Sequence, residues 1–72
     1  MGRIEGVVKS HSKQHGYGFL IDDKDEIYFF RNTQWEVPIP PVKGLRVEFE
    51  PVKTDKGMRA TKIGRIYRRK GK

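Results

Sequence analysis

Short runs of β-favouring residues alternate with turn signals along this chain, and no segment keeps the spacing of an amphipathic helix. Such a helix repeats apolar residues at positions i, i+3, i+4 and i+7, whereas eight glycines and four prolines interrupt this sequence. Pro38, Pro40 and Pro41 exclude a central strand from the segment that contains them. The stretches DDKDE and KTDKG are typical of hairpin turns. Strands are predicted at residues 3–11, 17–22, 26–31, 45–52 and 58–66.

Five short strands in so small a chain favour a closed barrel, because the unpaired edges of an open sheet invite aggregation. We therefore expect an all-β fold, a five-stranded antiparallel OB-fold barrel, over residues 1–66. A basic tail is expected at residues 67–72. An SH3-like barrel is the alternative architecture. The apolar residues that form the predicted core are Ile4, Val8, Leu20, Ile27, Phe29, Val47, Phe49, Ala60 and Ile63.

Four aromatic rings, Tyr17, Phe19, Tyr28 and Phe30, occupy alternate positions in two neighbouring predicted strands. Side chains alternate between the faces of a strand, so with the predicted core pointing inward these four rings point outward together. Gly18 favours this arrangement, because a residue without a side chain adds little to the inner face. The rings would then form a platform for nucleobases, each stack contributing roughly 1–3 kcal/mol. The alternative is the reversed register, in which these rings are the core.

Positive charge is concentrated in the C-terminal part of the chain. Residues 53–72 carry nine Lys/Arg and one acid, a net charge of +8, whereas residues 1–52 carry seven basic and eight acidic side chains, a net charge of −1. Basic chains of uneven charge usually bind a polyanion, although solubility alone would also account for the charge. Stacking surfaces bordered by cations are what single-stranded RNA or DNA requires. The basic side chains beside the aromatic runs are Lys9, Lys13, His15 and Arg31.

The order and spacing of five segments resemble the cold-shock domain family of bacterial cold-shock and Y-box proteins. HGYGFL resembles the first ribonucleoprotein motif of that family, and EIYFFR resembles the second. The sequence GYGF also occurs in RNA-recognition motifs, but the flanking residues differ here and no helices are predicted. The segments that carry the resemblance are GVVK at 6–9, HGYGFL at 15–20, EIYFFR at 26–31, GLRVEFE at 44–50 and GMRATKI at 57–63.

The resemblance implies an OB-fold that binds single-stranded RNA or DNA with modest sequence preference. The two rings of the family's first motif fall on Tyr17 and Phe19. In the second motif, the family's first Phe falls on Tyr28, its His on Phe30 and its last Phe on Arg31. The resemblance therefore assigns these five positions to base stacking.

Other positions match the family less closely. The basic strand residue of the family falls on Lys9, and Trp35 is the nearest counterpart of an exposed loop aromatic. Ser10 and His11 stand where the family usually has Trp and Phe, and Arg31 stands where it has the last Phe. The surface is therefore shifted from aromatic toward cationic, which predicts weaker base discrimination and a steeper salt dependence. Cations of the last strand are expected to border the platform. The predicted nucleic-acid-binding residues are Lys9, His11, Lys13, His15, Tyr17, Phe19, Tyr28, Phe30, Arg31, Trp35, Arg59 and Lys62.

No catalytic, metal or cofactor site is predicted. His11 and His15 are four residues apart, but their loop is not helical, the chain has no cysteine, and a zinc site needs three or four ligands. The acidic turn lacks the glycine and spacing of a calcium loop, and no nucleophile or phosphate loop indicates an enzyme.

A cytoplasmic monomer without a membrane partner is expected, because the sequence MGRIEG lacks the apolar region of a signal peptide. Two other functions stay open at this point. One is a protein-interaction barrel on a ribosome or polymerase, and the other is a small barrel of chromatin type that binds duplex DNA.

Overall fold

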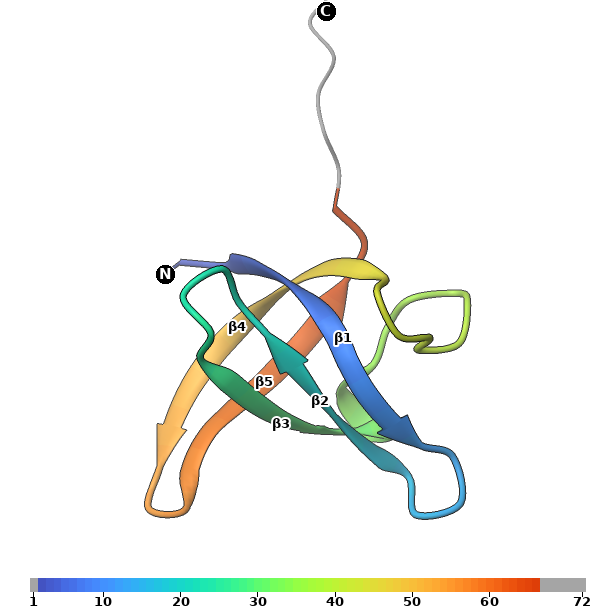
Figure 1. Cartoon of the computed structure of the whole chain (residues 1–72), viewed down its shortest axis with the longest axis horizontal. Helices are drawn as coiled ribbons and strands as arrows, with labels where there is room; N and C mark the ends of the chain where they lie inside the picture. The colour runs from blue at the N-terminus through green and yellow to red at the C-terminus, as the bar shows by residue number, and fades with distance from the viewer. Residues whose placement is uncertain (1, 67–72) are drawn as a thin grey trace, which may run out of the picture.

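The computed structural model describes residues 2–66, and the predicted basic tail at residues 67–72 lies outside the described part. Figure 1 shows five strands wound around a common interior, with a short helical turn and a long loop between β3 and β4. The strands agree with the predicted ones to within two residues at each end. The elements are β1 (Ile4–Ser12), β2 (Tyr17–Ile21), β3 (Ile27–Arg31), the 3-10 turn η1 (Asn32–Gln34), β4 (Arg46–Thr54) and β5 (Gly57–Gly64).

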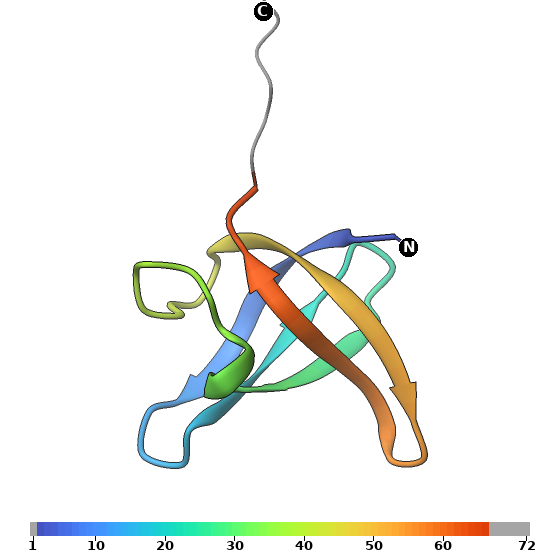
Figure 2. The same ribbon diagram turned by 180° about the vertical axis from the view of Figure 1, so that it is seen from behind.

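The strands close into a barrel in the order β1-β2-β3-β5-β4, which confirms the predicted all-β, five-stranded OB-fold barrel. The first half of β1 pairs with β4 and the second half pairs with β2, both antiparallel. Seen from behind, β4 and β5 lie side by side as an antiparallel hairpin (Figure 2). β3 and β5 run parallel where Phe29 meets Arg59, so the antiparallel barrel closes through a parallel contact.

The interior of the barrel is filled by apolar side chains from all five strands and from the loop after η1. Most of the predicted core is buried, and Ile4 is half-buried against it. Val37, in the loop, was not part of the predicted core. The buried side chains are Val8, Leu20, Tyr28, Phe30, Val37, Val47, Phe49, Ala60 and Ile63.

The predicted orientation of β3 is wrong. Tyr28 and Phe30 are buried, with 5% and 1% of their surface exposed, whereas Ile27 is 43% exposed. Phe29, a predicted core residue, is half-buried on the outer face. Because side chains alternate, a shift of one residue moves every side chain of a strand to the opposite face. Tyr28 and Phe30 therefore cannot serve as the outward stacking rings that the sequence and the resemblance predicted.

Gly18 supplies the physical reason for the burial of Phe30. The two residues are paired across β2 and β3, and a Cβ atom at Gly18 would lie 2.9 Å from the Phe30 ring and 2.6 Å from the Ser10 carbonyl oxygen. The ring thus occupies the space that a side chain at position 18 would need. The missing side chain of Gly18 therefore makes room for an inward ring, contrary to the outward orientation that the sequence predicts for Phe30.

Candidate nucleic-acid interface

Three aromatic rings lie together on the outer face of β2 and β3. Phe19 is paired with Phe29 across the two strands, and Tyr17 lies two residues before Phe19 on the same face. The ring centroids are 5.4 Å apart for Tyr17 and Phe29, 5.8 Å for Phe19 and Phe29, and 6.1 Å for Tyr17 and Phe19. All three are half-buried and leave part of their surface exposed. We call Tyr17, Phe19 and Phe29 the ring cluster.

Two arginines contact the ring cluster through Phe29. The guanidinium carbon of Arg31 lies 5.6 Å from the centroid of the Phe29 ring, and that of Arg59 lies 5.0 Å from the same centroid. Arg31 is paired with Tyr17 at the end of β3, whereas Arg59 reaches Phe29 through the parallel contact with β5. Both distances are within the range of a cation–π interaction. The structure thus brings the predicted residues Arg31 and Arg59 to one ring.

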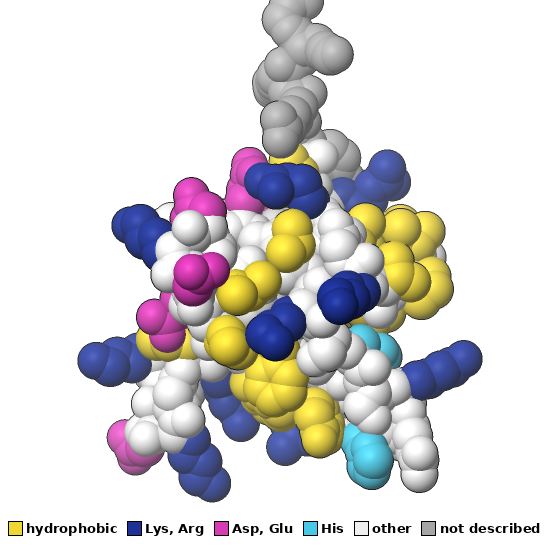
Figure 3. Space-filling model, in the orientation of Figure 1, with side chains coloured by type: hydrophobic (Ala, Val, Ile, Leu, Met, Phe, Trp, Pro, Cys, Tyr) yellow, Lys and Arg dark blue, Asp and Glu magenta, His cyan; other side chains and the backbone are white. Residues whose placement is uncertain are grey.

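The opposite end of the ring cluster borders an aliphatic row. Val7 is paired with Ile21, and Ile21 with Ile27, across β1, β2 and β3. Figure 3 shows hydrophobic side chains gathered over β2 and β3, with His side chains beside them and acidic side chains toward the β2–β3 turn. The exposed face therefore changes from aromatic and cationic at one end to aliphatic and acidic at the other.

The predicted residues before β2 lie around the margin of this face. Lys9 is exposed at an irregularity in the pairing of β1 with β2, between Val8 and Ser10. Lys13 is exposed in the turn between these strands. His15, also exposed, has its Nδ1 atom hydrogen-bonded to the Ser12 hydroxyl at 2.8 Å and its ring centroid 6.0 Å from that of Tyr17.

His11 and Trp35 both contact the buried Phe30 and are not part of the ring cluster. The His11 ring is stacked on Phe30 with a centroid distance of 5.9 Å, and the Trp35 ring is stacked on it at 5.5 Å. His11 Nε2 is hydrogen-bonded to Asn32 Oδ1 at 2.8 Å, and Trp35 Nε1 donates to the Ile39 carbonyl oxygen at 2.9 Å. The His11 bond thus ties β1 to η1, whereas the Trp35 bond lies within the loop that follows η1. Both rings are half-buried.

Lys62 follows Arg59 along β5, and its side chain is exposed. Its backbone has a positive φ of 49°, and its N–H donates to the Gln34 side-chain oxygen at 3.0 Å. This bond ties β5 to η1. The structure therefore gives the backbone of Lys62 a fixed place beside the end of β3.

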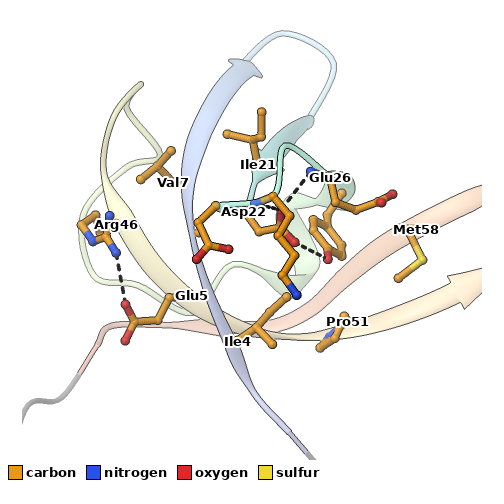
Figure 4. Close-up of a pocket in the computed structure, with 13 residues that line it drawn as sticks. Ile4, Glu5, Val7, Ile21, Asp22, Glu26, Arg46, Pro51 and Met58 are labelled. Carbon is orange, nitrogen blue, oxygen red and sulfur yellow. Dashed lines mark hydrogen bonds and ion pairs between the residues drawn. The ribbon is translucent and has the colours of Figure 1, made fainter.

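Tyr28 lines a groove of about 760 Å³ between β1, the β2–β3 turn and the β4–β5 hairpin. Figure 4 shows Ile4, Pro51 and Met58 around this groove, with Asp22 and Glu26 at the β2–β3 turn. The Tyr28 hydroxyl donates to Asp22 Oδ2 at 2.8 Å. Burial, followed by this bond, raises the pKa of Tyr28 to about 12. The predicted stacking residue is therefore anchored in the wall of the groove.

Asp22 organises the β2–β3 turn. Its Oδ1 atom accepts hydrogen bonds from the backbone N–H groups of Lys24 and Glu26, both at 2.9 Å. Burial alone would raise the pKa of Asp22, but the N–H of Glu26, the hydroxyl of Tyr28 and the N–H of Lys24 together lower it. These bonds stabilise the carboxylate, so Asp22 acts as the acceptor that sets the turn and the direction of Tyr28.

Sequence reasoning missed Phe29, the central ring of the candidate interface. Its neighbours Tyr28 and Phe30 are aromatic too, so hydrophobicity alone could not separate the inner from the outer residues. Gly18 is the signal that could have identified it. A glycine leaves space for a ring on the partner strand, which places Phe30 inward and therefore Phe29 outward. Tyr17, Phe19, Arg31 and Arg59 were predicted, and the structure brings them together around Phe29.

No family model matches this chain, and no curated protein matches it either. Within residues 2–66, no three His, Asp or Glu side chains are grouped closely enough to hold a metal ion. No helix in the same range has both the length and the apolar character needed to cross a membrane.

Proposed function

We propose that this protein binds single-stranded RNA or DNA in the manner of a cold-shock domain, by binding alone and without a catalytic step. Bases stack on the ring cluster, and phosphates bind the cations around it. The observation that carries the proposal is the contact of three outward rings with one another and of two guanidinium groups with one of them. Aromatic faces bordered by cations are the surface that unpaired bases require.

The chemistry of the face favours single strands over a duplex. Every base offers a π-face to an aromatic ring, but in a duplex those faces are covered by neighbouring base pairs. The formal net charge of +7 adds attraction for the backbone, and this attraction weakens as salt rises because counterions compete for phosphates. We therefore expect strong salt dependence and little competition from duplex DNA.

The test is a fluorescence-anisotropy titration of labelled single-stranded RNA and DNA with a duplex competitor, at low and high salt. Phe19→Ala should weaken binding by about 1–3 kcal/mol and leave the barrel folded, because Phe19 lies on the outer face. Val42→Ala is the matched control, since Val42 is 54% exposed in the loop before β4, outside the ring cluster. It should bind like the wild type.

Three results would contradict the proposal. The first is a folded wild-type sample that binds no single strand at low salt, which would favour a protein partner for the same face. The second is equal loss of affinity in Phe19→Ala and Val42→Ala. The third is displacement of the bound strand by the duplex competitor, which would indicate a duplex-binding barrel.

A further inference from the structure

A small hollow of about 80 Å³ lies where β3, η1 and β5 meet, next to the ring cluster. Arg31 and Arg59 both line it, together with Phe29, Thr33 and Gln34. The two arginines come from different strands, β3 and β5, which pair in parallel at Phe29 and Arg59. The fold therefore places two cations, distant in the sequence, at one concave site.

The two guanidinium groups lie on the same ring, and neither forms an ion pair with a carboxylate within residues 2–66. Their carbons lie 5.6 and 5.0 Å from the Phe29 centroid, so like charges share one aromatic support. The ion pairs found within residues 2–66 join other arginines, Arg3 to Glu48 and Arg46 to Glu5. Because like charges repel, an anion placed between Arg31 and Arg59 would lower the energy of both.

The other polar groups of the hollow also favour an anion. The Gln34 side-chain oxygen accepts the N–H of Lys62 at 3.0 Å, so the end of the amide that is left to face a ligand is its NH₂ donor. Thr33 is exposed and adds a hydroxyl. A guanidinium presents its N–H groups as a planar fork that matches two oxygens of a phosphate. The hollow thus offers donors to a tetrahedral anion.

We infer that this hollow is a phosphate-binding site in which one phosphate group is held jointly by Arg31 and Arg59. The inference rests on the proposed function, because the phosphate belongs to the bound single-stranded nucleic acid. The base next to this phosphate stacks on the ring cluster. The bound phosphate anchors the nucleic acid at the edge of the ring cluster. It thereby fixes the point at which the nucleic acid crosses from β3 to β5. The same chemistry fits an internal phosphodiester or a terminal phosphate.

The first experiment counts the phosphates that the two arginines neutralise. Affinity for a single-stranded oligonucleotide is measured against salt for the wild type, Arg31→Gln, Arg59→Gln and the double variant. Each neutralised phosphate contributes about 0.7 to the slope of log K against log salt on single strands. A shared phosphate predicts that the double variant loses about 0.7 of slope, with an affinity loss well short of the product of the two single losses.

Arg46→Gln is the matched control, because it removes the same charge from β4, where Arg46 pairs with Glu5 at 3.2 Å. It should leave the slope unchanged. A loss of about 1.4 in the double variant, with affinity losses that multiply, would mean two separate phosphates and would overturn the inference. An unchanged slope in the double variant would overturn it as well.

The second experiment identifies the phosphate. Neutral methylphosphonates replace the phosphates of the oligonucleotide one position at a time, and 5′- and 3′-phosphorylated strands are compared with unphosphorylated ones. One internal position, or one terminal phosphate, should matter in the wild type and lose its effect in the double variant. If no position depends on the two arginines, the inference is wrong.

A third measurement separates failure of this inference from failure of the proposed function. Inorganic phosphate is titrated into the labelled protein while the side-chain N–H signals of Arg31 and Arg59 are followed by NMR. Signals that shift together with one binding constant support the site even if oligonucleotides do not bind. If Phe19→Ala weakens oligonucleotide binding but neither inorganic phosphate nor the arginine variants have an effect, the function stands and the phosphate site is refuted.

Discussion

The bond between Tyr28 and Asp22 shows how a single pair of residues turns an aromatic side chain away from solvent. The phenol is buried, and the carboxylate that accepts its hydrogen bond also accepts hydrogen bonds from two backbone N–H groups of the turn. The pKa values move in opposite directions, up for Tyr28 and down for Asp22. Both shifts mean that the folded protein favours neutral tyrosine beside ionised aspartate.

This pair predicts a specific dependence of stability on pH. The pKa of Tyr28 rises from 10.0 to about 12 on folding, so its contribution is complete below pH 10 and is lost as the pH rises toward 12. The pKa of Asp22 is lowered from 3.8, so its contribution is complete above that value and is lost in acid. Tyr28→Phe should lower the unfolding free energy by about 1–2 kcal/mol at neutral pH and by less at pH 11–12.

Urea unfolding of the wild type and Tyr28→Phe at pH 7 and pH 11.5 checks this prediction. Tyr17→Phe is the control, because the structure records no hydrogen bond from the Tyr17 hydroxyl among the described residues. A difference between wild type and Tyr28→Phe that stays constant from pH 7 to pH 11.5 would show that the hydroxyl does not bind a carboxylate.

The strand β3 shows which structural features can be predicted from the sequence and which cannot. The strands, their order and the barrel follow from short alternating runs and turn signals, and the structure confirms them. Within IYFF, however, every residue is apolar, so alternation alone could not tell Tyr28 and Phe30 from Ile27 and Phe29. The decision depends on contacts outside β3, namely the space above Gly18 and the acceptor at Asp22.

A substitution at Gly18 tests whether the space above this residue sets the orientation of β3. Gly18→Ala would place a methyl group 2.6 Å from the Ser10 carbonyl oxygen and 2.9 Å from Phe30, so β1 or Phe30 must shift. We expect a loss of about 1–3 kcal/mol in unfolding free energy, as for other overpacked cores. Thermal or urea unfolding measures it.

Gly64→Ala provides the comparison in β5. Among residues 2–66, a Cβ atom there would meet only the end of the flexible Arg3 side chain, at 3.4 Å, so the stability of Gly64→Ala should stay close to that of the wild type. Equal stability of Gly18→Ala and the wild type would mean that Phe30 does not depend on the space at Gly18.

Across the whole molecule, charge is arranged along the length of β2. The exposed acids Asp23 and Asp25 lie in the turn after β2, whereas Lys13 and His15 lie in the turn before it. The sequence predicted the excess of positive charge, but not that the ring cluster would lie between an acidic and a basic turn. A bound strand should therefore lie closer to the basic turn.

Removing the acidic charges should strengthen binding. The double variant Asp23→Asn/Asp25→Asn keeps side chains that tolerate the positive φ of 67° at position 25 and lessens repulsion of phosphates. We expect affinity for single strands to rise by about 2- to 5-fold at low salt and the gain to vanish near 1 M salt, where screening acts within about 3 Å. Anisotropy titrations at both salt concentrations check it, and a gain that persists in high salt would exclude a long-range electrostatic origin.

The parallel contact between β3 and β5 has a consequence for how recognition and folding are coupled. It joins Phe29 to Arg59, thirty residues apart in the chain, so the candidate surface exists only after the barrel has closed. A ligand that touches both strands binds the closed state alone, and mass action then raises the free energy of opening by RT ln(1 + [L]/Kd). Protein with bound ligand should therefore resist separation of β3 from β5. A barrel in which only β3 and β5 have separated would keep its hairpins but lose its affinity for the ligand.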